Sequence, residues 1–444
     1  MMLAKPSLSI LGTDPAHRRC VLNGNAFQQD AIQSFNGWQY ACFYSSLPGA
    51  AATEPLFVHL SRRKLPIGDW ETLVFDDYPQ TTDDGHNTVQ LGICPGDGTV
   101  HLSYDHHCDI IRYRHSTARV AEAPEKFKWK AKLFTSTLDH LPGLPSQDEL
   151  FGYITYPRFV RLESDLLFSF RTGKAGLGDD HLCVYKPSTG NYTLLGTNLK
   201  GVENNPYIHG LDFRDSRLYV TWVYRAFVWY EGWDDPLDTK HKQQAGPNSG
   251  ENNHNICFAY SDDGGKTWCN GSGVQIADLS KKESVLPNSP GIVAFDIPKG
   301  SSLANQEAQA VDHEGGVHVL NRDNLDGEQR WKHYYKPPKG SWIQHPIPRV
   351  QGAYGGKRGQ LALSKDDDLY FILPDHKSSV LSILKASKSQ FSEYELVWQQ
   401  DGFPPTEPLV DKARLDYDNV LSVFTRADAG SEGQINIVAL DFQL

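Results

Sequence analysis

The chain has 444 residues, a formal net charge of −11 and a hydrophobic content of 39%. The negative charge argues against a nucleic-acid backbone or an anionic lipid surface as the main partner, because both would be repelled on average. The sequence contains no run of about 18 apolar residues, so we expect no membrane-spanning segment. Ten Trp, 20 Tyr and 20 Phe beside only two Met favour β-strands, since aromatic side chains suit a pleated surface.

A repeated pattern runs along most of the chain. Each copy begins with a turn, continues with alternating apolar residues and ends on a polar residue. Alternating runs separated by turns are typical of β-hairpins, and a repeat of about 50 residues is typical of a propeller. We therefore predict an all-β fold, a single-domain seven-bladed β-propeller with four-stranded blades over residues 1–444. The copies start at Trp38, Gly98, Asp165, Ser216, Gly315, Asp367 and Asn419.

The fourth blade is predicted to carry an insertion at about 226–253, a stretch rich in Trp, Tyr, Asp and Asn. The segment SDDGGKTW, which ends at Trp268, follows this insertion and has the form of an Asp-box. In such a hairpin the Asp caps the loop, Gly supplies a positive φ angle and Trp packs beneath. The motif indicates the fold and not the chemistry.

His, Tyr and Arg recur at the ends of the inner strands and of the strands beside them in three neighbouring blades. Propellers bind ligands at the mouth of the central channel, so matching positions of different blades converge there. Each residue alone has an ordinary structural explanation, such as a hydrogen-bonded core His or a solvated Arg. Their repeated placement favours a shared site. The residues are His86, His106 and His107 in the second blade, Tyr156 and Arg171 in the third, and Tyr207, His209 and Arg225 in the fourth.

These residue types favour β-elimination beside a uronate carboxylate. Glycoside hydrolysis normally needs two carboxylates that flank the bond, whereas Asp84 and Asp105 lie in turn-like or outward contexts. In an elimination, Arg or cationic His neutralises the carboxylate and so acidifies the C5 proton. A Tyr or His then removes that proton, and a second group protonates the departing O4.

Several longer segments between about residue 36 and residue 430 carry a family resemblance. They include GHNTVQLGICPGDGTVHLSYDHH, TYPRFVRLESDLLFSFRTG, HNICFAYSDDGGKTW and NQEAQAVDHEGGVHVLNR. In combination they resemble the BNR-repeat proteins that include propeller polysaccharide lyases, namely ulvan lyases and L-rhamnose-α-1,4-D-glucuronate lyases. The resemblance implies a propeller enzyme that acts on an acidic polysaccharide.

The resemblance also implies roles for individual residues. It makes His86, His106, Tyr156 and Arg171 catalytic, with His107 as a one-residue alternative to His106. His and Tyr would act as acid and base, while Arg and His would neutralise the carboxylate. The choice of His86 or Tyr156 as the base stays open. Substrate-binding residues are expected at His107, Tyr207, His209, Arg225 and Arg358.

No cofactor is expected to be required for this chemistry. Some relatives hold a structural zinc ion, which would make a metal site conceivable here, although the spacing of the available residues matches no standard zinc signature. The seven Cys residues include no CxxC pair, and their odd number leaves at least one thiol unpaired in a monomer. The conceivable metal ligands are His254, Cys257, Cys269 and His333.

The resulting functional hypothesis is a lyase that cleaves the L-rhamnose-α-1,4-D-glucuronate linkage. It would release rhamnose caps from gum arabic or arabinogalactan side chains and leave a 4,5-unsaturated glucuronate. Three alternatives remain, namely an ulvan lyase, an α-L-rhamnosidase that hydrolyses the same linkage, and a non-catalytic glycan-binding propeller. A sialidase is disfavoured, because no convincing Tyr–Glu pair is visible.

The cellular location is expected to be extracellular. MMLAKPSLSI at the start is too short and too interrupted for a signal peptide. Two N-glycosylation sequons, at Asn191 and Asn270, nevertheless suit a secreted protein. We expect a monomer whose partner is the acidic polysaccharide itself.

Overall fold

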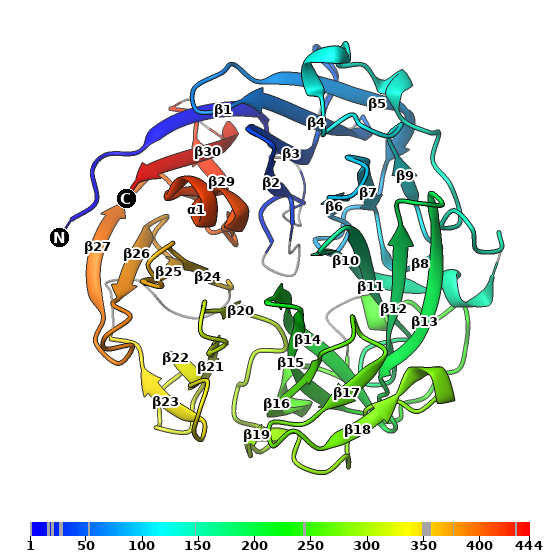
Figure 1. Ribbon diagram of the computed structural model, residues 1–444, viewed down its shortest axis with the longest axis vertical. Helices are drawn as coiled ribbons and strands as arrows, with labels where there is room; N and C mark the ends of the chain where they lie inside the picture. Colours follow the sequence, from blue (N-terminus) through cyan, green and yellow to red (C-terminus); the bar gives the residue numbers. More distant parts are fainter. Residues whose placement is uncertain are drawn as a thin grey trace.

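The computed structural model describes residues 2–444 except 16–17, 19–21, 26–29, 52–53, 147, 243–245, 349–356, 376 and 431–432. The described strands form seven sheets that stand around a common axis (Figure 1). The prediction of a seven-bladed β-propeller is therefore confirmed. None of the helices in this part of the chain has the length and apolarity that crossing a membrane requires.

The first three blades follow one another along the chain. The first contains β2 (Ile32–Phe35), β3 (Trp38–Ser45), β4 (Leu56–Lys64) and β5 (Glu71–Gln80). The second contains β6 (Val89–Ile93), β7 (Val100–Tyr104) and β9 (Tyr113–His115). The third contains β10 (Ile154–Leu162), β11 (Asp165–Thr172), β12 (Asp180–Lys186) and β13 (Asn191–Leu199), and β8 (His107–Asp109) pairs with β10 at its inner edge.

The fourth blade is the largest. It contains β14 (Asn204–Arg214), β15 (Arg217–Ala226), β16 (Asn253–Ser261), β17 (Thr267–Cys269), β18 (Gln275–Asp278) and β19 (Val293–Phe295). The fifth contains β20 (Ala308–Val311), β21 (Val317–Asp323), β22 (Arg330–Lys336) and β23 (Ile343–Pro346). The sixth contains β24 (Gln360–Leu363), β25 (Leu369–Pro374), β26 (Leu381–Ala386) and β27 (Glu395–Gln400).

The seventh blade closes the ring. It joins β28 (Leu409–Val410), β29 (Val420–Asp428) and β30 (Ile435–Gln443) to β1 (Ser7–Thr13) from the other end of the chain. The helix α1 (Lys412–Asp418) connects β28 to β29. Six short 3-10 helices lie in the described connections: η1 (Pro124–Lys126), η2 (Ala131–Leu133), η3 (Glu149–Phe151), η4 (Lys240–Lys242), η5 (Gly250–Asn252) and η6 (Leu279–Lys281).

The repeat marks the second strand of every blade. Each predicted copy begins within two residues of β3, β7, β11, β15, β21, β25 or β29. The number of strands in a blade was predicted less well, since the second blade has three and the fourth has six. After β9 the chain runs through η1, η2 and η3 instead of a fourth strand. Pro124, Pro142 and Pro145 occur in this segment, and proline cannot donate a ladder hydrogen bond.

Neighbouring blades pack through their inner strands. Gly92 on β6 lies against Phe159 on β10, where an added Cβ would come within 2.5 Å of the ring. Ring closure is reinforced by buried charges, because Asp441 on β30 pairs with Arg63 of the first blade at 2.6 Å and with Arg414 of α1 at 2.7 Å. The blades are therefore held together both by apolar contacts and by buried ion pairs.

The Asp-box forms the hairpin between β16 and β17, as the sequence predicts. The Asp263 carboxylate accepts hydrogen bonds from the backbone N–H groups of Lys266 and Thr267, at 3.0 and 2.9 Å. Gly264 and Gly265 have φ angles of +73° and +96°. Trp268 is completely buried beneath the turn.

The two glycosylation sequons lie in different environments. Asn191 is exposed at the start of β13. Asn270 is only 4% exposed, and its Nδ2 donates to the carbonyl oxygen of Pro290 at 2.8 Å. Its Oδ1 accepts from the backbone N–H of Ser272. The amide of Asn270 is thus engaged in the folded chain, and only the Asn191 sequon is placed where a glycan could be attached.

Candidate active site

The candidate residues gather where inner strands of the second, third and fourth blades begin. His86 lies just before β6, Tyr156 lies near the start of β10, and Tyr207 lies near the start of β14. In Figure 1 these three inner strands stand next to one another around the axis. The antiparallel partners of β10 and β14 end at the same face, which brings Arg171 and Arg225 to the same mouth of the ring.

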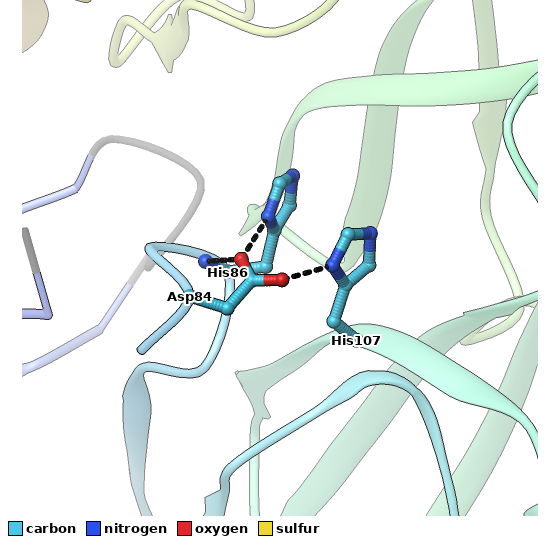
Figure 2. Close-up of side chains that lie close together, drawn as sticks. All are labelled: Asp84, His86 and His107. Atoms are coloured by element: carbon cyan, nitrogen blue, oxygen red, sulfur yellow. Dashed lines mark hydrogen bonds and ion pairs between the residues drawn. The ribbon is translucent and has the colours of Figure 1, made fainter. Parts of the chain in front are cut away.

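The centre of the site is a carboxylate shared by two imidazoles. The Nδ1 atoms of His86 and His107 each lie 2.5 Å from a different oxygen of Asp84 (Figure 2). The two rings stack with centroids 3.8 Å apart. Because the carboxylate accepts from both rings, each His carries its proton on Nδ1 and presents Nε2 on its other edge. We refer to Asp84, His86 and His107 as the His–Asp–His cluster.

Charge within the His–Asp–His cluster follows from burial and from these hydrogen bonds. Burial favours the neutral acid of Asp84, but the hydrogen bonds from His107 and His86 hold the pKa of this carboxyl well below its usual range. Burial, assisted by the neighbouring His86, lowers the pKa of His107 to about 3. Near neutral pH, Asp84 is therefore an anion and His107 is neutral. The sequence places Asp84 in a turn and gives no sign of its contact with both rings.

The structure brings His107, and not His106, into contact with His86. The strand β7 ends at Tyr104, and Asp105 has a φ of +65°, which interrupts the alternation of side chains. The Nε2 of His106 instead accepts a hydrogen bond from the backbone N–H of Arg112 at 2.8 Å. His106 is 1% exposed, and burial lowers its pKa well below the usual value. These contacts place His106 in the blade interior.

Tyr156 has an unusual backbone. Its φ is +56°, at a bulge between Thr155 and Arg158 in the pairing of β10 with β11. A non-glycine residue in this region is strained, and such strain persists where the surrounding structure imposes it, often at functional sites. The bulge turns the phenol towards the His–Asp–His cluster, with 5.8 Å between the ring centroids of Tyr156 and His86.

Guanidinium groups surround the phenols of the third and fourth blades. The Cζ of Arg171 lies 4.9 Å from the ring centroid of Tyr156 and 5.1 Å from that of Tyr207. Burial raises the pKa of Tyr156 to about 12, although Arg171, Arg358 and Arg225 act in the opposite direction. Arg171 is 3% exposed, and its Nε has no hydrogen-bond partner among the described residues. This buried cation is suited to receive an anionic group.

Arg225 is held more firmly by the protein. Its Nε donates to Oδ1 of Asn253 at 2.8 Å, and its Nη1 donates to the carbonyl oxygen of Asn248 at 3.2 Å. Its Cζ lies 4.6 Å from the ring centroid of Tyr207. Arg225 therefore fixes Tyr207 beside Arg171 and adds positive charge to the site.

His209 and Arg358 bind residues of the later blades. The Nε2 of His209 is 2.7 Å from Nδ2 of Asn321 in the fifth blade, and burial lowers the pKa of His209 to about 3. Arg358 forms an ion pair with Glu407 at 2.8 Å and donates to the carbonyl oxygen of Gln306 at 2.6 Å. Its charge still lowers the pKa of Tyr156. Arg358, just before β24 in the sixth blade, thus acts on the site electrostatically.

The insertion supplies a residue that the sequence analysis did not single out. His241, in η4, lies with its ring centroid 6.5 Å from that of His107 and its Nε2 2.8 Å from the hydroxyl of Tyr153. The next residue, Lys242, forms an ion pair with Asp109 at 3.2 Å. The insertion therefore reaches from the fourth blade across the third to the His–Asp–His cluster.

The four conceivable metal ligands do not form a group in the described part of the chain. The Nε2 of His254 is 2.8 Å from Oδ1 of Asn204, and the Nδ1 of His318 is 3.0 Å from Nε2 of His333. Cys257 is buried in β16, while Cys269 lies on β17, paired with Tyr260. Among the described residues, the His–Asp–His cluster is the one group of three or more His, Cys, Asp or Glu side chains whose ligand-type atoms all lie within 4.8 Å of one another. Hydrogen bonds from both rings to Asp84 account for those distances.

The chain resembles ulvan lyases in sequence. It is 24% identical over 351 residues to the long isoform of an ulvan lyase from Pseudoalteromonas sp. (strain PLSV), an alignment that covers 69% of this chain and 33% of that protein. It is 25% identical over 359 residues to the long isoform of the ulvan lyase from Alteromonas sp. (strain LOR), with the same coverage. The chain thus spans about a third of the length of these curated relatives.

Solved structures show the same architecture. The crystal structure of the polysaccharide lyase Uly1 superposes with a TM-score of 0.72 at 17% identity and covers 100% of both chains. A PL25 ulvan lyase superposes with a TM-score of 0.66 at 12% identity, over 98% of this chain and 94% of the other. The sequence profile of the BNR repeat-containing family matches residues 38–350, so the chain belongs to that family.

Proposed function

We propose that the protein is a polysaccharide lyase that cleaves the L-rhamnose-α-1,4-D-glucuronate linkage by β-elimination. The observation that carries the proposal is the convergence of Arg171, Tyr156 and the His–Asp–His cluster at one mouth of the propeller. This set supplies a cation for a uronate carboxylate and several groups that can move protons. The names of the relatives, which are polysaccharide and ulvan lyases, support the same class of reaction.

In the proposed reaction, Arg171 pairs with the uronate carboxylate and stabilises the negative charge that develops as C5 loses its proton. Either Tyr156 or His86 takes that proton, and the electrons of the C5–H bond form the C4–C5 double bond. The C4–O4 bond breaks, and the remaining acid group protonates O4. Rhamnose leaves with O4, and a 4,5-unsaturated glucuronate stays on the polysaccharide.

The carboxylates of the second blade argue against hydrolysis of the same linkage. Both oxygens of Asp84 accept from His86 and His107. Asp105 is 4% exposed, and its carboxylate accepts from Tyr78 at 2.5 Å and from Asn87 at 2.6 Å. Hydrolysis needs one carboxyl group to donate a proton and another to activate water or attack carbon. Neither of these two acids is placed for such a role.

A second candidate substrate is ulvan, which the names of the curated relatives favour. Both candidates present a uronate to the same residues and differ in the sugars on either side of it. We further propose that the protein acts outside the cell as a monomer and needs no cofactor for the elimination. The exposed Asn191 sequon supports secretion.

Incubation with gum arabic and with ulvan in parallel, followed by mass spectrometry of the products, tests the proposal. Elimination gives an unsaturated uronate that absorbs in the ultraviolet and is lighter by one water than the hydrolytic product. Free rhamnose with an intact glucuronate would mean hydrolysis. Binding without any product, unchanged by Tyr156→Phe, would mean a glycan-binding propeller.

A further inference from the structure

The two stacked imidazoles of the His–Asp–His cluster differ in exposure. The side chain of His86 is 26% exposed, whereas that of His107 is 7% exposed. Both rings bind the same carboxylate, so their hydrogen bonds to Asp84 do not account for the difference. Because burial opposes the charged form of an imidazole, this difference decides which of the two rings takes up a proton more readily.

His241 of the insertion contributes to the burial of His107. Its ring centroid lies 6.5 Å from that of His107, and the two ring planes are inclined by 71°. His241 is itself only 6% exposed. The contact joins two segments that are distant in the sequence, so it depends on where the insertion is placed.

Two contacts hold His241 in this position. Its Nε2 is 2.8 Å from the hydroxyl of Tyr153, the residue before β10. The next residue, Lys242, forms an ion pair with Asp109 of β8 at 3.2 Å. His107 begins this same strand. The insertion is therefore fastened to β8 and to the start of β10, with which β8 pairs.

The protonation of His107 depends on burial more than on any one charge. Burial, followed by the neighbouring His86, lowers the pKa of His107 to about 3, although Asp84 acts in the opposite direction. Water admitted beside the ring would therefore raise this pKa. The titratable groups on the segments around His107 are Asp84 and His86 before β6, Cys108 and Asp109 on β8, Tyr153 and Tyr156 beside the start of β10, Arg171 on β11, and His241 in η4.

We infer that His241 is a positioning residue that shields His107 from water, so that a proton carried by the stacked pair resides on His86. His86 is also the ring that lies beside Tyr156. The inference rests on the proposed function, because the place of this proton affects catalysis only if His86 and Tyr156 act on a substrate. Whether His86 is the acid or the base, a positive charge on His107 would hinder it.

NMR of the histidine rings in the full chain tests the shielding without any substrate. The His107 signal is assigned by its loss in His107→Gln, and in the wild type this ring should stay neutral at pH 5 and above. In His241→Ala we expect the pKa of His107 to rise by about one to two units, towards that of an exposed histidine. His241→Leu fills the same space with an apolar side chain and should leave the titration of His107 as in the wild type.

Leu237→Ala is the matched control, because Leu237 belongs to the same insertion and is 85% exposed. It should leave the titration of His107 unchanged. An unchanged titration in His241→Ala would overturn the shielding role. An equal rise of the His107 pKa in His241→Ala and in either His241→Leu or Leu237→Ala would overturn it as well.

The pH profile of kcat tests the consequence for catalysis. On gum arabic or on ulvan, whichever the wild type cleaves, the acidic limb of the profile should move to higher pH in His241→Ala and stay in place in His241→Leu. A raised pKa of His107 without any movement of this limb would overturn the catalytic part of the inference. If the wild type forms no product from either polymer, the proposed elimination fails, while the NMR titration still decides whether His241 shields His107.

Discussion

The imidazole rings of His86 and His107 lie face to face, with centroids 3.8 Å apart and planes inclined by 20°. His86 lies in the turn before β6 and His107 begins β8, yet both bind the same carboxylate. Two cationic imidazoles at this separation would repel each other, so the pair accommodates at most one positive charge. The arrangement is suited to passing one proton between the site and a substrate.

Asp84 is predicted to orient this pair without touching the substrate. Asp84→Asn presents an amide N–H to one of the two rings, which then has to carry its proton on Nε2. We expect kcat to fall by about 100-fold or more, the scale of a misplaced general acid or base, and the pH profile of kcat to shift. Steady-state kinetics across pH would measure both.

The neighbouring Asp83→Asn is the control for Asp84→Asn, because Asp83 is exposed and carries the same charge. It should change neither kcat nor the pH profile. If Asp84→Asn reduces thermal stability but leaves the pH profile of kcat unchanged, Asp84 stabilises the fold and does not orient the two rings for the reaction.

Tyr156→Phe removes one hydroxyl and keeps the ring between His86 and Arg171. If the phenol moves a proton in the reaction, kcat should fall by about 100- to 10,000-fold with little change in KM. Tyr207→Phe, in the same aromatic group, should lower kcat much less. Similar small losses of kcat in the two variants would show that Tyr156 does not transfer a proton, and His86 would then be the base.

Arg171 is predicted to recognise the carboxylate of the substrate. Arg171→Ala should lower kcat/KM by about 100- to 1,000-fold, the effect of losing one preorganised charge in a dry site. Arg171→Lys should restore part of that loss, since lysine keeps the charge but lacks the planar fork. A substrate whose carboxyl group has been reduced should react equally slowly with wild type and Arg171→Ala. A difference between the two enzymes on that substrate would contradict the assignment.

His209 gives a prediction about stability and pH. Burial lowers its pKa to about 3 in the fold, whereas an unfolded histidine titrates near pH 6.5. Between these values the unfolded chain binds a proton that the folded chain does not, so the contribution of His209 is complete above pH 6.5 and is lost as the pH falls towards 3. His209→Gln should therefore lose less stability than wild type between pH 7 and pH 5, by up to about 2 kcal/mol. Urea unfolding at the two pH values measures this difference, and parallel losses in both proteins would contradict it.

The fold could be predicted from the sequence because hydrophobic alternation and turn residues recur at regular spacing. Every predicted copy became the second strand of a blade. The number of strands in a blade was less predictable, since it depends on whether segments such as residues 116–153 find a sheet edge to pair with. That depends on tertiary packing and leaves no periodic signal in the sequence.

The site was predictable only in part. His86 and Tyr156 were identified because they precede inner strands, and Arg171 because it ends the second strand of its blade; the three do come together. His106 and His107 could not be ranked, because the left-handed backbone of Asp105 breaks the period of two that strand reasoning assumes. Asp84 looked like an ordinary turn residue, and its second contact, with His107, depends on how β8 folds back. The position of Asp84 two residues before His86 does indicate a contact between them, because an Asp at this spacing can accept from the later backbone N–H. The backbone N–H of His86 donates to Oδ1 of Asp84 at 2.9 Å.

The short strand β8 affects how well the spacing between His107 and Tyr156 is kept. His107 follows the second blade in the chain, but its backbone pairs with Thr155, immediately before Tyr156, in the third. Because main-chain pairing joins these two segments, the His107 imidazole and the Tyr156 phenol are carried by the same sheet. Small opening motions between the second and third blades would therefore leave the spacing of these two side chains unchanged.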